Sequence, residues 1–202
     1  MEPSMSKLLL PDVTLVCADG INKDISKMLE WLQTEITFHD CKLFQDNITS
    51  LQDYNKFIMH DLCDHVDSEF CMIVQADGHP VNLDSWEDEF LNYDYIGAPW
   101  YTQPWRIDKT VGNGGFSIRS KKFLEQSSFF TEYDGLSEPE DVFLCRTVDE
   151  ALKDLGMTFA PHDVAYRFSV EDMPYKGQFG FHGKGTIALS RHYGLHLGSD
   201  FK

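Results

Sequence analysis

The sequence predicts an α/β fold, in which a mixed, mainly parallel β-sheet is flanked by helices within one domain. Two continuous apolar runs, residues 13–17 and 70–74, have the composition of strands buried on both faces. Helical spacing of apolar residues between them gives the alternation of strand and helix that is typical of such folds. The 202 residues, 42% of them hydrophobic, suit a single domain over residues 1–202.

The first half of the chain predicts the following elements in order. The strand at 13–17 leads into a helix over about residues 21–36, and a short strand is expected near 42–44. A second helix begins after Ser50, which with Asp53 has the pattern of a helix cap. After the strand at 70–74, a short helix follows Asp84 and a strand covers 95–97.

The second half begins with a glycine-rich turn over residues 112–115 and a strand of edge or mixed type over 116–119. Ser137 and Glu140 have the spacing of a capping box and predict a helix that ends at Gly156. Strands are expected near 157–160 and 165–170. The tail is rich in glycine and histidine and has little periodicity.

The net charge and the cysteine content indicate which ligands and which cellular location the protein is expected to have. The formal net charge of −16 argues against non-specific binding to nucleic acid, which needs a positive surface. It leaves open a local basic face made of Arg106, Lys109, Arg119, Lys121 and Lys122. Five scattered cysteines are interpreted as reduced thiols, and neither a signal peptide nor a membrane span is expected. We therefore expect a cytoplasmic protein of a bacterium or of a virus-infected cell that does not associate with a membrane.

Acidic residues after two predicted strands are the first candidates for a binding site. Ligands of open α/β sheets bind beyond the carboxyl ends of the strands, where Asp19 and Asp77 lie. The Asp77 carboxylate suits Mg²⁺ or Mn²⁺, which prefer oxygen ligands and accept phosphate as a further ligand. A plain turn after a strand explains the Asp77-Gly78 pair equally well.

Two histidines are candidate metal ligands beside Asp77. His79 stands at a strand end, where a histidine is more often simply hydrogen-bonded. His182 lies between glycines and aromatic residues, as expected of a residue on a shaped loop, although a surface histidine is an equal alternative.

Other candidates lie in the second half of the chain. Glu140 fits the first turn of a helix, where acids complement the helix dipole, which leaves Asp141 as the candidate general base. The turn at 113–115 either offers backbone amides to a substrate or is a plain tight turn. An aromatic loop, which suits sugar rings, bases or simple packing, contains Trp100, Tyr101, Trp105 and Arg106.

Five segments together resemble a known family. In chain order they read VQADGHPVN, YDYIGAPW, VGNGGFSIRS, SEPEDVFLCR and FGFHG, and the resemblance extends from about residue 13 to 183. These segments resemble the bacterial and viral DUF5672 family of GT-A-like glycosyltransferases. GNGGFSIRS followed by EDVF is the most specific part.

The resemblance implies a Rossmann-like nucleotide-binding half, about residues 12–100, and an acceptor-side half, about 101–190. Asp77 matches the last acid of the D-x-D motif that holds the metal on the donor diphosphate, and Gln75 stands where the first acid would be. His182 matches a histidine that completes the metal shell, and Asp141 matches the base of an inverting enzyme. The resemblance further implies that Gly114 and Gly115 line the donor sugar and that Asp19 meets the nucleoside.

The expected function is transfer of a sugar from a nucleotide-sugar, such as a UDP-sugar, to a hydroxyl acceptor with Mn²⁺ or Mg²⁺ as cofactor. The acceptor is left open between a glycan and a modified, hydroxymethylated base of viral DNA. Two alternatives remain at this stage: a nucleotidyltransferase, and a non-catalytic module that binds a nucleotide or a carbohydrate.

Overall fold

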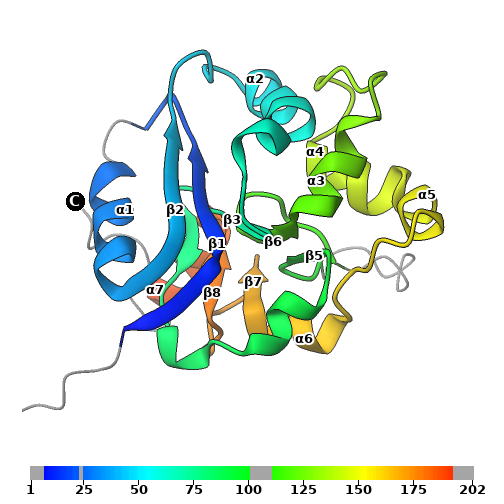
Figure 1. Cartoon of the computed structure of the whole chain (residues 1–202). Helices are drawn as coiled ribbons and strands as arrows, with labels where there is room; N and C mark the ends of the chain where they lie inside the picture. The colour runs from blue at the N-terminus through cyan, green and yellow to red at the C-terminus, as the bar shows by residue number, and fades with distance from the viewer. Residues whose placement is uncertain (1–6, 23–24, 101–110, 193–202) are drawn as a thin grey trace, which may run out of the picture.

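The larger β-sheet has the strand order β2-β1-β3-β6-β5. A computed structural model describes residues 7–22, 25–100 and 111–192 (Figure 1). The central β1 pairs in parallel with β2 and β3, whereas β6 runs antiparallel to both of its neighbours, β3 and β5. The strands span β1 (Leu8–Ala18), β2 (Ile36–Phe44), β3 (Phe70–Ile73), β5 (Tyr95–Gly97) and β6 (Ser117–Ser120). This confirms a mixed α/β fold of helices around one main sheet. The expectation that this sheet is mainly parallel is wrong, because among the described residues two of its strand pairs are parallel and two are antiparallel.

Both faces of this sheet are buried because its central strands present apolar side chains to each side. In β1, Val13, Leu15 and Cys17 belong to one core, whereas Val16 and Ala18 belong to another. Helix α1 (Ile25–Glu35) covers the first face (Figure 1). The second face is covered by α2 (Leu51–Lys56), a π-helical turn (Phe57–Asp61), a 3-10 turn (Leu62–His65) and α3 (Lys121–Ser128).

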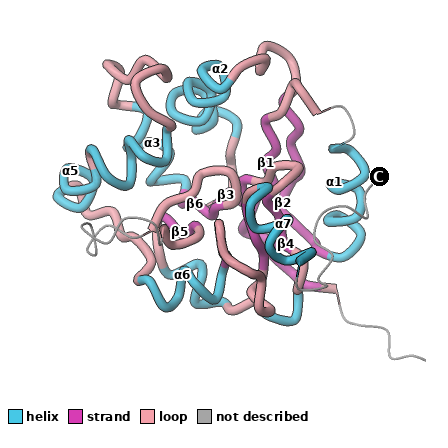
Figure 2. The backbone as a smooth tube through the Cα atoms, turned by 180° about the vertical axis from the view of Figure 1, so that it is seen from behind, coloured by secondary structure: helices cyan, strands magenta, loops and turns pink. Residues whose placement is uncertain are grey.

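A second, three-stranded sheet has the order β4-β8-β7. Its strands are β4 (Gly78–Pro80), β7 (Ser169–Glu171) and β8 (Gly180–His182), and α7 (Lys184–His192) packs beside β7 and β8. Figure 2 shows α7 and β4 from behind. The register pairs His182 with both Gly78 and Glu171, so these three residues lie side by side at one end of the strands of the small sheet. That end is close to the end of β3, because β4 begins only five residues after β3 ends.

The remaining elements are short. They comprise two 3-10 turns (Leu83–Ser85 and Asp88–Asn92), α4 (Glu140–Val142), a π-helical turn (Phe143–Thr147), α5 (Asp149–Asp154) and α6 (His162–Phe168). None of the helices within the described ranges has the length and apolar character needed to cross a membrane.

Several predicted elements are confirmed. The strands at 13–17, 70–74 and 95–97 correspond to β1, β3 and β5, and the strand near 42–44 is the end of the longer β2. Ser50 caps α2, because its Oγ accepts a hydrogen bond from the Asp53 N–H at 3.1 Å. The first helix begins at Ile25 rather than near 21 and ends before Ile36, which starts β2.

Other predicted elements are wrong. The Ser137 hydroxyl does not cap a helix but donates to the Asp134 carboxylate, so that the predicted capping box is absent and α4 begins after Pro139. Residues 157–160 form no strand and make one isolated bridge, from Phe159 to Tyr95. Most of the segment 165–170 is the helix α6. The strand expected at 116–119 is present as β6, and of its two expected types the mixed one holds, because β6 lies between β3 and β5 in a sheet that contains both parallel and antiparallel pairs.

Candidate functional site

A pocket of about 390 Å³ opens at the carboxyl ends of β1 and β3. Asp19, Gln75 and Asp77 line it together, so the structure brings three of the predicted site residues to one cavity. Two exposed apolar side chains, Ile21 and Leu51, stand at its wall. The other lining residues are Ala18, Asn22, Ile48, Ser50, Tyr54 and Lys184.

The carboxylate of Asp19 is occupied by its own loop. Oδ1 accepts hydrogen bonds from the backbone N–H groups of Ile21 and Asn22, both at 2.9 Å, and Oδ2 accepts one from the Asn22 amide at 2.6 Å. These bonds close the turn after β1 and fix its shape. The side chain therefore holds the pocket wall in place.

Asp77 sits at the tip of a tight hairpin that connects β3 to β4. The N–H and C=O groups of Gln75 and Gly78 bond to each other at 2.8 and 3.0 Å, and the Asp77 carbonyl accepts from the Gly183 N–H at 2.7 Å. The backbone of the hairpin is thus fixed by bonds within the hairpin and by a bond to the residue after β8. In contrast to Asp19, the half-buried Asp77 carboxylate has no hydrogen-bond or ion-pair partner among the described residues. It is available to a ligand.

His182 links the two sheets. Its Nδ1 lies 3.1 Å from Glu171 Oε1, and its Nε2 lies 3.2 Å from Gln75 Oε1. A carboxylate only accepts hydrogen bonds, so Nδ1 carries a proton and Nε2 points at Gln75. Sequence reasoning missed Glu171, because only the β7–β8 register brings it beside His182.

Two glycines make room for the His182 ring. A Cβ atom at Gly78 would lie 2.3 Å from His182 Cδ2, and one at Gly115 would lie 2.1 Å from Nε2. Any larger residue at either position would push the imidazole away from Gln75. Gly115, predicted to line the site, therefore supports it by packing.

His79 lies apart from this cluster. It is fully buried on β4, its ring packs edge-on against Phe181 at 5.1 Å, and its Nδ1 lies 2.9 Å from the Pro80 carbonyl. Successive strand residues point to opposite faces, so His79 points away from the side on which Gly78 meets His182. Burial lowers the pKa of His79 to about 4. This placement does not fit the metal role expected of it.

Asp141 meets the glycine-rich turn. The Gly114 N–H donates to Asp141 Oδ2 at 3.0 Å, and the Val142 N–H donates to Oδ1 at 2.9 Å. Gly115 of the same turn touches His182 and Gln75. The turn therefore connects Asp141, the predicted base, to the cluster around His182.

The neighbouring acid, Glu140, has a different role from the helix cap expected of it. It forms a two-pronged ion pair with Arg119 at 2.9 and 3.0 Å, in which the side chains are 2% and 1% exposed. The pair ties the start of α4 to β6. Because Arg119 is buried, the expected basic face loses this member.

The other described residues of the expected basic face and of the aromatic loop are not among the residues that line the pocket. Lys121 bonds to the Cys63 carbonyl and Lys122 to the Gly156 carbonyl, whereas Arg106 and Lys109 lie outside the described residues. Trp100 packs directly over Gly112 and lies under the Arg146 guanidinium, 3.9 Å from its ring centroid. Tyr101 and Trp105 also lie outside the described part of the chain.

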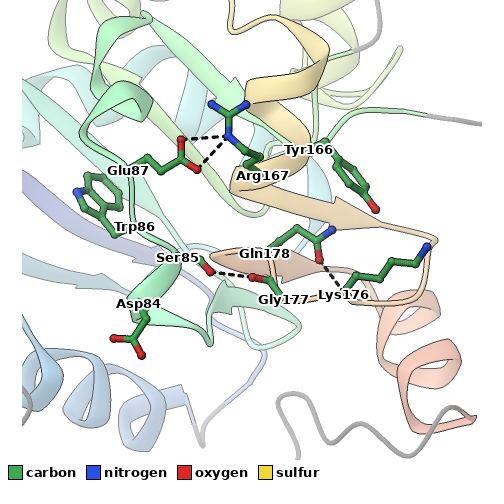
Figure 3. A pocket seen from close by; sticks show the side chains of 9 residues that line it. All are labelled: Asp84, Ser85, Trp86, Glu87, Tyr166, Arg167, Lys176, Gly177 and Gln178. Atoms are coloured by element: carbon green, nitrogen blue, oxygen red, sulfur yellow. Dashed lines mark hydrogen bonds and ion pairs between the residues drawn. The ribbon is translucent and has the colours of Figure 1, made fainter.

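A second cavity of about 420 Å³ opens at the other end of the strands of the small sheet (Figure 3). Several of its polar groups are paired with each other: Arg167 with Glu87 at 2.9 Å, Ser85 with the Gly177 carbonyl at 2.8 Å, and the Lys176 N–H with Gln178 at 2.8 Å. It contains none of the predicted site residues. We therefore place the candidate site at the first pocket.

Cation binding has a limited set of candidate ligands. Within the described ranges, no three His, Cys, Asp or Glu side chains are grouped so that they could hold a metal ion. The Asp77 carboxylate, the Gln75 amide oxygen and the His182 imidazole are the candidate donors at the pocket.

The fold and the site define a mixed α/β protein with a polar pocket beyond the carboxyl ends of two parallel strands. More particularly, the chain belongs to the family described as "Protein of unknown function (DUF5672)", which matches residues 38–182. The match includes every candidate residue except Asp19. Neither the curated proteins nor the solved structures gave a match.

Proposed function

We propose that this protein is a GT-A-like glycosyltransferase, which moves a sugar from a nucleotide-sugar, such as a UDP-sugar, to a hydroxyl acceptor with the help of Mn²⁺ or Mg²⁺. The observation that carries the proposal is the arrangement of the two acids. Asp77 offers to the pocket a carboxylate without a partner among the described residues, and Asp141 is bonded to Gly114 of the glycine turn, whose next residue, Gly115, contacts Gln75 of the same pocket.

The pocket suits the nucleoside diphosphate part of such a donor. Ile21 and Leu51, 67% and 63% exposed, offer apolar surface to a base at the pocket wall. Lys184 places an ammonium group at the same pocket, where it can attract phosphate. This combination of apolar wall and cationic side chain favours a nucleotide over a neutral ligand.

The candidate ligands for a divalent cation bound together with a diphosphate are Asp77, Gln75 and His182. With Nδ1 protonated, His182 Nε2 carries either a second proton or a lone pair, and it faces the Gln75 oxygen at 3.2 Å. Neighbouring ligands of an octahedral cation, each about 2.1 Å from it, are about 3 Å apart. When bound, the cation would supply positive charge that stabilises the leaving diphosphate.

Asp141 can accept the proton of the attacking hydroxyl. In the transfer, the acceptor oxygen bonds to the anomeric carbon of the sugar, and the bond from that carbon to the diphosphate oxygen breaks. The hydroxyl proton moves to Asp141, and the nucleoside diphosphate leaves with the electron pair. The Gly114 and Val142 N–H groups hold the carboxylate in one orientation for this step.

The two alternatives differ in their products. A nucleotidyltransferase would make a nucleotide-sugar and release diphosphate, whereas a binding module would hold the ligand without turnover. Gln75, which replaces an acid expected from the family resemblance, is the feature that favours a binding module.

The decisive experiment is a screen of nucleotide-sugars with Mn²⁺, with Mg²⁺ and with EDTA, in which release of the nucleoside diphosphate is measured. We expect one donor to be hydrolysed slowly in a metal-dependent manner, and Asp77→Asn to abolish this activity. Asp84→Asn is the matched control, because Asp84 is an exposed acid of the second cavity. Binding without release would favour a module, and activity retained in Asp77→Asn would contradict the proposed site.

A further inference from the structure

We propose that the side-chain amide of Asn113 binds hydroxyl groups of the transferred sugar and so selects the donor. This inference rests on the proposed glycosyltransferase function and assigns a specificity-determining residue to it. Three features of Asn113 carry the argument: its burial, its unpaired amide and its backbone conformation.

Asn113 is 1% exposed, yet neither its amide nitrogen nor its amide oxygen has a hydrogen-bond partner among the described residues. Buried polar groups in folded proteins nearly always have partners, because an unpaired group loses its bonds to water without replacement. A buried amide with both ends unpaired is therefore expected to have a partner that is absent from the structure of the protein alone.

The backbone at Asn113 adds a second observation. Its φ is 65°, in the left-handed region that favours glycine, and its neighbours Gly112 and Gly114 are both glycines. If the turn only needed this conformation, a third glycine would adopt it with less strain. The side chain is thus retained despite strain and despite its unpaired amide, which points to a role in binding.

The position of Asn113 indicates which part of a nucleotide-sugar it would meet. Along the turn, Gly115 contacts His182 and Gln75, where the diphosphate is proposed to bind, and Gly114 contacts Asp141, the proposed base. Asn113 is the residue next to Gly114, and it does not line the pocket proposed for the nucleoside. A ligand group that reaches Asn113 lies close to the proposed base, which takes the proton of the hydroxyl that attacks the sugar, so the transferred sugar is the part of the donor that meets it.

The chemistry of an amide matches this ligand. The amide offers one acceptor and two donors without a net charge, and each hydroxyl of a sugar both donates and accepts. The uncharged donor and acceptor of the amide can bond to two adjacent hydroxyls at once. They bind a phosphate only weakly, because phosphate binds most strongly to cationic groups. The ligand class that fits Asn113 is therefore a polyhydroxylated sugar ring.

The test compares Asn113→Gly with wild type by calorimetric titration in Mn²⁺, using UDP, UDP-glucose, UDP-galactose, UDP-xylose and GDP-mannose. Glycine keeps the left-handed backbone, so the melting temperature should stay the same or rise. We expect unchanged affinity for the free nucleotide and at least about a tenfold loss for the nucleotide-sugar that wild type binds. Asn47→Gly is the control, because Asn47 is exposed and has nearly the same φ, 64°.

A second measurement separates recognition from a loosened loop. The affinities of donor analogues that each lack one sugar hydroxyl are compared with the affinity of the complete donor on the same protein. For wild type, at least one analogue should bind more weakly than the complete donor, whereas for Asn113→Gly that analogue should bind as well as the complete donor. Equal losses for nucleotide and nucleotide-sugar, or no loss for either, would overturn the role of Asn113 and leave the proposed function standing. Failure of wild type to bind any of these nucleotide-sugars would overturn both.

Discussion

The backbone N–H of Gly114 donates a hydrogen bond to Oδ2 of Asp141 at 3.0 Å, across 27 residues of sequence. This bond joins the turn before β6 to the start of α4. A Cβ at Gly114 would lie 1.8 Å from Glu140 Oε1, so the same glycine contacts both neighbouring acids. Gly114 therefore determines how closely the two segments approach.

Replacement of Asp141 by asparagine tests its role as a base. The amide oxygen can still accept from the Gly114 N–H, whereas the amide nitrogen cannot accept from the Val142 N–H. One of the two backbone bonds therefore remains to hold the side chain, and proton acceptance is lost. We expect donor hydrolysis to fall about 100- to 10,000-fold. The rate of nucleoside diphosphate release measures this, and an Asp141→Asn protein with wild-type activity would exclude the assignment.

Breaking the Arg119–Glu140 pair should destabilise the fold strongly. Arg119→Ala leaves the Glu140 carboxylate buried without its partner, which we expect to cost about 3–5 kcal/mol of unfolding free energy in urea titrations. The double variant Arg119→Met, Glu140→Leu removes both charges and should recover most of this loss. A single variant no less stable than wild type would show that the pair does not hold α4 to β6.

That double variant also separates positioning from stability. If the ion pair positions Asp141, donor hydrolysis should remain low although the melting temperature has recovered. Full activity in the stable double variant would show that Asp141 is held by the Gly114 and Val142 N–H groups alone.

Glu171→Gln tests whether His182 binds a cation. A carboxylate behind a metal-binding histidine orients the ring and raises its basicity, so loss of the charge should weaken Mn²⁺ binding about 10- to 100-fold. Electron paramagnetic resonance of free Mn²⁺ measures the affinity directly. Glu125→Gln, at an exposed acid on α3, is the control and should bind as wild type does. Equal affinities of wild type and Glu171→Gln would remove His182 from the proposed shell.

His79 should make the fold sensitive to mild acid. Burial lowers its pKa to about 4, whereas a histidine in the unfolded chain titrates near 6.5. The unfolded chain then binds more protons between these values, so stability falls as pH falls from about 6.5 to 4, by up to about 1.4 kcal/mol per pH unit. Urea titrations of wild type and His79→Gln across this range isolate the effect, and parallel pH profiles would contradict it.

The features predicted correctly from sequence are those with a local cause. The run at 70–74 is apolar on every residue, which requires burial on both faces and makes β3 recognisable. Asp77 follows this strand at the hairpin tip, so its place at the pocket follows from position alone. Ser50 caps α2 through a bond to a residue three positions away.

The features that were missed depend on contacts between distant segments or on competition between local bonds. Ser137 had the spacing of a cap, but the Asp134 carboxylate three residues earlier takes its hydroxyl and its N–H in a turn. A strand was expected at 165–170, although Pro161 before this segment is a helix-start signal that marks α6. Glu171 and the Arg119–Glu140 pair have no local signature, because the partners lie 11 and 21 residues apart.

The contact between His182 and Gln75 has a consequence for biosynthesis. The two residues are 107 positions apart, and Gly115, which packs on both, comes between them in the chain. During translation Gln75 and Gly115 are synthesised well before His182, and Lys184 of the pocket wall follows it. The contact between His182 and Gln75 therefore depends on the pairing of β8 with β4, which a nascent chain cannot make before residue 182 has been synthesised.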